Sequence, residues 1–283
     1  MRAFKLAGLR RAEAGRSGAA SAAAGRSGWI SDMHAICVHC VLAVCMASAV
    51  ACPQGAAQED SSVHIQQISD AARLDIRQQG AGNTTEISQS GRDNALSLDI
   101  LGNRNGSAGT PNTITQSGSG SVAALSITGD DNVFRVNQSG SASGEANNTA
   151  EAFVLGDANL LLVDQANAFG ASFANTALLS QTGDNNTASI AQEIAPYGLA
   201  GGLNQAGIHQ SGLDHVARIE QAGADNNALI EQDGSGNTGT ILQDGTGLQA
   251  ALHQSGGGLD YTINQTGCVT GGCSPILVTQ TGP

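Results

Sequence analysis

One eleven-residue unit, built around the motif Gln-x-Gly, recurs along most of this chain. With the Gln as register point, there are eighteen points between residues 67 and 280, and twelve of the seventeen gaps are eleven residues long. Gln occupies fifteen points, and Gly follows two residues later at fifteen. Such a repeat constrains the fold more than any single residue, because each unit can bury its apolar face only by stacking on its neighbours.

The composition within each unit predicts a β-strand. Asn stands six residues before ten of seventeen register points, small residues predominate four before, and an aliphatic residue stands two before in all cases but Ala152. These positions alternate with mostly polar ones, which is the period of a strand. A helix would need apolar residues at 3.6 spacing and would carry Gly, Asn and Asp in the middle of each unit. We therefore expect about six residues of strand and five of turn per unit.

The predicted fold class is all-β, a β-solenoid or cross-β stack of about eighteen short strands with two strands per 22-residue rung. Equivalent residues then stack at ~4.7–4.8 Å, so that Gln on Gln and Asn on Asn become buried amide ladders. The candidate ladder residues are Gln78, Gln89, Gln181, Gln192, Gln210, Gln221, Gln232, Gln243, Gln254, Gln265, Asn83, Asn94, Asn132, Asn186, Asn226 and Asn237.

Five longer gaps interrupt the rhythm. Four follow odd-numbered strands, those ending at Gln138, Gln165, Gln192 and Gln265, and the fifth follows Ile100. With two strands per rung, four of the loops should leave the same edge, either as a contact surface or because loops there do no harm.

Residues 1–57 are interpreted as a signal-peptide region. Residues 35–51 form an apolar run with basic residues before it and Ala-rich cleavage sites after it, and Met33 is an alternative start. A membrane anchor and a lipoprotein site at Cys52 are weaker alternatives. Residues 58–66 are expected to form a short mature N-terminal segment, and residues 67–283 the repeat domain. The last repeat strand is expected to lack a capping element.

Charge and cysteine usage narrow the function classes. From residue 58 onward there are 6 Arg against 22 acidic residues, a formal charge of −16, so a nucleic-acid partner is not expected. Four of the six Cys lie in or beside the apolar run. Cys268 and Cys273, in a Cys-x4-Cys pair, suit a small disulfide loop better than a metal site in an exported chain.

No enzyme or cofactor is predicted. His209, His215 and His253 are assigned to different repeat positions, so that they form no ladder, and the acidic residues are scattered. Asp residues in the turns suggest calcium repeats only weakly, because the period is eleven rather than nine. As surface charge, they are expected to slow premature aggregation.

The pattern Gln-x-Gly-x-x-Asn-x-Ala-x-x-x-Gln, complete at 181–192 and 221–232, resembles the curlin repeat of bacterial curli subunits. The resemblance implies a secreted subunit that polymerises into an extracellular amyloid fibre for biofilm matrix and adhesion. Its implied partners are itself, other curli subunits and a curli-type outer-membrane secretion pore. The chain departs from the family pattern where Leu248, Leu259 and His215 replace Asn and where Ser leads few repeats. A soluble or surface-tethered β-solenoid adhesin, or a nucleating or accessory curli subunit, is the alternative.

Overall fold

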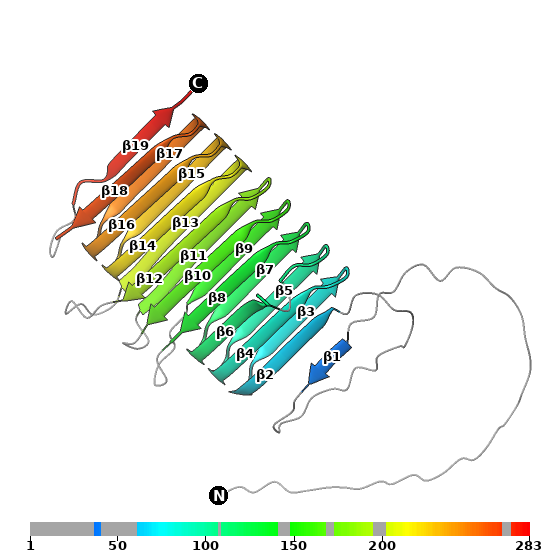
Figure 1. The fold of residues 1–283 in the computed structure, drawn as a ribbon. Coiled ribbons are helices and arrows are strands. Elements are labelled where there is room, and N and C mark those ends of the chain that lie inside the picture. The colour runs from blue at the N-terminus through cyan, green and yellow to red at the C-terminus, as the bar shows by residue number, and fades with distance from the viewer. Residues whose placement is uncertain are drawn as a thin grey trace, which may run out of the picture. The chain divides into compact units, whose positions relative to one another are not determined.

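The computed structural model describes residues 37–40, 61–106, 109–140, 148–167, 173–194, 202–267 and 273–283. Its eighteen repeat strands, β2 to β19, alternate between two parallel sheets, so that each rung contributes one strand to each sheet (Figure 1). The predicted β-solenoid class is therefore confirmed. A short strand, β1 (Cys37–Cys40), pairs with β2 and falls within the segment interpreted as a signal peptide.

Strands of even number form sheet A. They are β2 (Ser62–Asp70), β4 (Thr84–Arg92), β6 (Asn112–Ser119), β8 (Val133–Ser139), β10 (Leu160–Asn167), β12 (Thr187–Ile194), β14 (Val216–Ala224), β16 (Thr238–Thr246) and β18 (Asp260–Thr266). Strands of odd number form sheet B. They are β3 (Arg73–Gln79), β5 (Ala95–Leu101), β7 (Val122–Thr128), β9 (Thr149–Leu155), β11 (Phe173–Thr182), β13 (Gly202–Leu213), β15 (Asn227–Ser235), β17 (Gln249–Gly257) and β19 (Ile276–Thr281).

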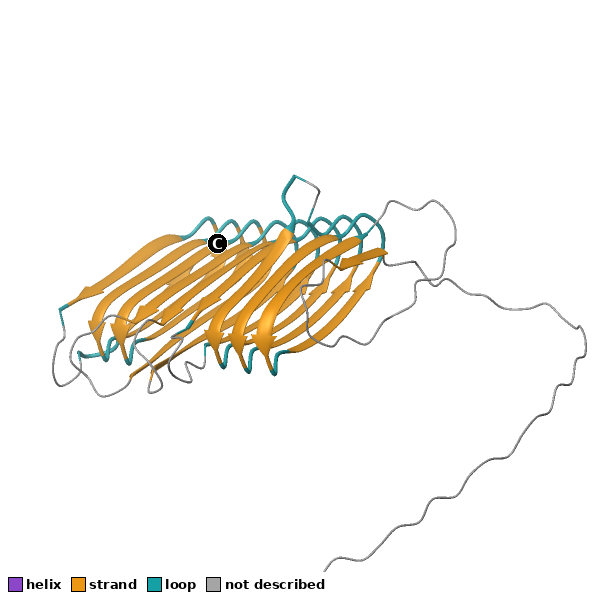
Figure 2. Cartoon of the chain, turned by 90° about the horizontal axis from the view of Figure 1, so that it is seen from below, coloured by secondary structure: helices purple, strands orange, loops and turns teal. Residues whose placement is uncertain are grey.

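The strands pair in register on the repeat. In sheet A, Gln192 of β12 is level with Gln221 of β14, and Gln221 is level with Gln243 of β16. Residue spacings differ between rungs, but the longer connections leave the pairing unchanged. Figure 2 shows the consequence, two strand layers joined by turns along both edges. The connections after β8, β10, β12 and β18 all run from sheet A to sheet B, so their described ends lie at one edge.

A narrow core lies between the sheets. Inward positions of each strand are buried, and Ile87, Ile190, Ile219, Ile230 and Ile241 are at most 1% exposed. Because small residues occupy many of the other inward positions, apolar burial per rung is limited. Hydrogen bonding along the stack must therefore contribute more to stability than in an ordinary globular core.

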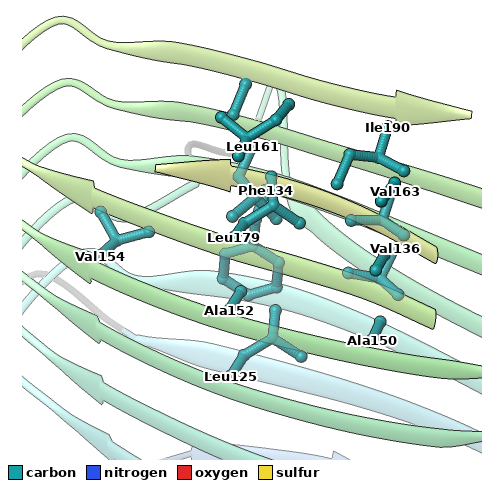
Figure 3. Close-up of a cluster of buried hydrophobic side chains, with 14 of the residues drawn as sticks. Leu125, Phe134, Val136, Ala150, Ala152, Val154, Leu161, Val163, Leu179 and Ile190 are labelled. Carbon is teal, nitrogen blue, oxygen red and sulfur yellow. The ribbon is translucent and has the colours of Figure 1, made fainter. Parts of the chain in front are cut away.

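Ala152 breaks the aliphatic rule, and the facing sheet compensates for it. Phe134 of β8 stands where most units carry a small residue, and its ring is 1% exposed. Figure 3 shows this ring beside Ala152, Leu125 and Leu179, so a large side chain on one sheet fills the space left by a small one on the other. Volume is thus conserved across the core rather than position by position.

Candidate functional site

Gln side chains form a continuous hydrogen-bonded ladder in sheet A. The Nε2 of each Gln donates to the Oε1 of the next Gln along the stack, at 2.5–2.9 Å from Gln89 to Gln265. The members are Gln89, Gln116, Gln138, Gln165, Gln192, Gln221, Gln243 and Gln265. All are at most 6% exposed, so their hydrogen bonds to one another replace the hydrogen bonds that the amides would make to water in the unfolded chain.

Sheet B holds a shorter ladder. Nε2 donates to Oε1 from Gln181 to Gln210, Gln232, Gln254 and Gln280 at 2.8–3.0 Å. On β5, β7 and β9 the same slot holds Ile100, Ile127 and Val154, all buried. Gln78 of β3 is therefore separated from the ladder, and its Nε2 donates to the carbonyl of Asn83 instead.

A second bond from the same amide ties the two sheets together. The Nε2 of Gln221 in sheet A also donates to the carbonyl of Gln205 in sheet B at 2.8 Å. In the opposite direction, Gln232 of sheet B donates to the carbonyl of Val216 in sheet A at 3.1 Å. Each such Gln thus satisfies both N–H groups, one along the stack and one across the core.

Asn side chains act differently from the expected amide-on-amide ladder. At the edge where sheet B strands lead into sheet A, the Oδ1 of Asn132 accepts the backbone N–H of Asn159, and its Nδ2 donates to the carbonyl of Gly156. Asn83, Asn105, Asn159 and Asn186 bond in the same way. The prediction of Asn–Asn bonds is wrong at this edge, because the amide oxygen and nitrogen of each Asn bond turn backbone groups instead.

The other edge mixes both kinds of contact. Asn175 donates to the Oδ1 of Asn148 and Asn204 donates to that of Asn175, at 3.2 and 3.3 Å. Asn94 and Asn226 bond backbone groups, the former accepting from Ser121 and the latter from Leu248. The candidate Asn residues are all buried at turns, and their common role is to close the backbone at the start of a strand.

His215 occupies an Asn slot and reproduces its bonds. Its Nδ1 accepts the backbone N–H of Asn237 at 3.3 Å, and its Nε2 lies 3.2 Å from the carbonyl of Ser211. The ring is fully buried, and because a backbone N–H can only donate, Nδ1 is the acceptor and Nε2 faces the Ser211 carbonyl as the donor. By contrast, Leu248 and Leu259 have no side-chain group for such bonds, although each backbone N–H still bonds the preceding Asn.

The Gly of each Gln-x-Gly allows the rungs to approach. Gly234 has φ +110°, and a Cβ there would lie 2.1 Å from the carbonyl oxygen of Gly256 in the next rung. Other motif glycines meet the same obstacle at 1.7–2.5 Å, among them Gly91, Gly129 and Gly223. The motif needs Gly for both its backbone conformation and this close contact.

Turn carboxylates are used as backbone acceptors. The N–H of Asp130 donates to Oδ1 of Asp157 at 2.7 Å, and the N–H of Asp157 donates to Oδ1 of Asp184 at 2.8 Å. Hydrogen bonds from the guanidinium of Arg104 to the adjacent Asp131 lower the pKa of that carboxyl, and the positive charge of Arg104 adds to the effect.

The structure changes the assignment of the histidines. His209 and His253 share one repeat position, on β13 and β17, with Glu231 of β15 level between them. The prediction that the three His occupy three different positions is therefore wrong, and only His215 stands apart.

Cys273 is disulfide-bonded, and Cys268 lies outside the described residues, so their pairing stays a prediction.

In the described ranges, no cluster of three or more His, Cys, Asp or Glu side chains is arranged to hold a metal ion. None of the described residues forms a helix with the length and apolarity that crossing a membrane requires. The chemistry concentrated in this part of the chain is that of stacked amides, and the stack itself is the candidate functional site.

A two-sheet parallel solenoid with buried amide ladders defines a class of repeat protein in which each rung pairs in register with the next. Residues 173–193 and 234–267 match the curlin associated repeat. Two segments of the chain thus carry the curlin associated repeat, and the resemblance noted from its motifs is confirmed there. No curated protein matches it.

Proposed function

We propose that this chain is a secreted structural subunit that assembles end to end into extracellular curli-like amyloid fibres for biofilm matrix and surface adhesion. The observation that carries the proposal is the in-register Gln ladder, which runs along the stack axis in both sheets. A ladder of this kind gains one hydrogen bond for each added rung, as in cross-β fibres. The curlin associated repeat supports the same reading, and it favours a structural subunit over an enzyme.

Edge strands provide the surfaces on which growth would occur. In the described part of the chain, β3 and β19 are the outermost strands of sheet B, and β18 is outermost in sheet A. An unpaired strand edge templates pairing with another chain. The proposed partners are therefore other copies of the chain, other curli subunits and, for export, a curli-type outer-membrane pore.

Seeded growth tests the proposal. Purified protein at neutral pH is followed by thioflavin-T fluorescence, with and without its own aged product. We expect a lag followed by growth, a lag abolished by seeding, and a fibre reflection at ~4.7–4.8 Å along the axis. A flat trace from a protein that stays soluble and β-rich would overturn the fibre and favour a capped solenoid adhesin or an accessory subunit.

A further inference from the structure

The outer face of sheet B carries an exposed apolar patch, here called the sheet B patch, formed by Leu101, Phe153, Leu155 and Leu178. These four side chains are 44–47% exposed. Apolar groups on the solvent face of a parallel sheet indicate that something covers that face. We propose that the occupant is a second copy of this chain, which packs its own sheet B face to face with the stack axes antiparallel.

Charges on either side of Phe153 carry this inference. Phe153 lies on β9, one residue before the register point, and the same row continues across the neighbouring strands. Towards one end the row reaches Asp99 on β5 and Arg77 on β3, whose charged groups are 3.6 Å apart within the chain and stay largely exposed. Towards the other end it reaches His209 on β13 and Glu231 on β15, at equal distances in strands from Phe153, and Glu231 also lies 2.6 Å from Nδ1 of His253 on β17.

A two-fold axis parallel to the strands at β9 therefore brings complementary groups together. It places Arg77 opposite Glu231 of the second copy, and Asp99 opposite His209 of the second copy, each twice per dimer. If the two stacks were parallel instead, each residue of the row would face its own equivalent, Arg77 on Arg77 and Glu231 on Glu231. Complementarity thus selects the antiparallel arrangement.

Side-chain volumes on this face fit the same axis. The next outward row stands three residues before the register points. In this row Leu178 on β11 falls opposite Ala124 on β7 of the second copy. Gly207 on β13 falls opposite Ser97 on β5, and a shallow hollow surrounds these small residues. In these two pairs a larger side chain meets a smaller one, while Phe153 packs on its equivalent at the centre. Glu151, on β9, faces its own charge, and Leu229 on β15 faces Asp75 on β3.

The available area suits a specific contact. From β3 to β15 the face spans six strand spacings, about 29 Å, and strands of seven residues are about 23 Å long. The contact therefore covers on the order of 600 Å² per partner, near the lower range of stable interfaces. The inference goes beyond end-to-end growth, because a face-to-face contact leaves the strand edges at both ends of the stack open.

Charge reversal on the full-length chain, freshly purified and studied by sedimentation velocity over a concentration series, tests the pairing. Arg77→Glu and Glu231→Arg should each raise the dimer dissociation constant about tenfold, since each turns two attractive pairs repulsive. The double variant Arg77→Glu/Glu231→Arg should return to within about threefold of the original value. Phe153→Ser should weaken the dimer at unchanged charge, and Glu151→Gln should strengthen it.

Matched controls lie on the outer face of sheet A. Arg135→Glu and Asp164→Arg make the same charge changes at exposed positions of β8 and β10, and they should leave the dissociation constant unchanged. Arg77 and Glu231 are six strand spacings apart within one chain, so recovery in the double variant requires a contact between copies. The proposal is overturned if the wild type stays monomeric at every soluble concentration, if the controls weaken it equally, or if the double variant fails to recover.

Discussion

From β11 to β19 every strand of sheet B carries Gln at the register point, whereas β5, β7 and β9 carry Ile100, Ile127 and Val154. The backbone pairing is the same in both regions. Rungs therefore stack without the amide, and what the amide adds is a directional bond that only a matching amide can complete. Both matches to the curlin associated repeat fall in the region where sheet B carries Gln.

The junction between the two regions shows the cost of mixing them. Gln181 is the first Gln of the resumed ladder, and its buried Oε1 has no hydrogen-bond partner because Val154 supplies no donor. A buried unpaired acceptor costs about 1–3 kcal/mol. Such a penalty falls where a hydrogen-bonded amide run begins, and the buried Oε1 of Gln89, at the start of the sheet A ladder, likewise has no partner.

The largest expected effect concerns the backbone, which the two regions share. Gly234→Ala in the Gln region and Gly129→Ala in the aliphatic region should each lower the free energy of unfolding by about 3–5 kcal/mol, because the new Cβ would overlap the next rung. Urea titration followed by circular dichroism measures both. Gly109→Ala, where a Cβ meets nothing within 4 Å, is the control and should change little. A large effect in one region alone would show that the backbones differ.

A substitution at the register point should destabilise the Gln region more than the aliphatic region. Gln232→Leu leaves the Nε2 of Gln210 without its acceptor and the Oε1 of Gln254 without its donor. We expect a loss of about 2–4 kcal/mol in the same urea assay. Ile127→Leu, at the equivalent slot of the aliphatic region, should cost less than about 1.5 kcal/mol. Equal losses would mean that the ladder adds nothing beyond packing.

Introducing amides tests the boundary penalty. Ile127→Gln alone buries an amide between Ile100 and Val154 and should cost about 2–3 kcal/mol. The triple variant Ile100→Gln/Ile127→Gln/Val154→Gln gives Gln181 its missing donor and should lie within about 1 kcal/mol of the original. The measurement is the difference between the triple variant and three single ones. Additive losses would contradict the ladder's cooperativity.

The smallest expected effect is in the turns. Arg104→Gln removes the hydrogen bonds that lower the pKa of Asp131, so that pKa should rise towards its ordinary value of 3.8. A lowered pKa in the folded state contributes stability above the unfolded pKa, and this contribution is lost as pH falls through the folded value. Both side chains are about half exposed, so solvent screening keeps the change below about 0.5 kcal/mol. Carboxyl NMR titration of Asp131 gives the pKa shift, and an unchanged value would contradict the assignment.

Strand positions and the two-sheet stack could be predicted because period-two alternation and an eleven-residue repeat leave few alternatives. The insertion after Ile100 could not be placed. Counting back from Gln116 gives Thr110 as the expected Asn slot, yet Asn105 fills it, and its carbonyl accepts from Thr84. Asn105 thus completes the turn, and the extra residues follow it in the chain. Sequence spacing alone does not show whether the extra residues come before or after the residue that fills the Asn slot.

The repeat pattern also did not predict which group each Asn side chain bonds. Nothing in the spacing distinguishes an Asn that bonds the next Asn from one that bonds a turn carbonyl, because both place the side chain in the same slot. The Phe134–Ala152 compensation and the sheet B patch depend on which strands face or adjoin one another. Those relations follow from the strand register across irregular gaps, which the spacing of the motif does not determine.

The Gln–Gln bonds from Gln89 to Gln265 in sheet A and from Gln181 to Gln280 in sheet B all point the same way, with Nε2 on the lower-numbered residue and Oε1 on the higher-numbered one. A column of such rungs is therefore a vector. One terminus of the column presents amide hydrogens outward and the other presents amide oxygens, so an incoming rung meets different chemistry at each. Elongation rates at the two termini should consequently differ, and a filament labelled in two colours should lengthen asymmetrically.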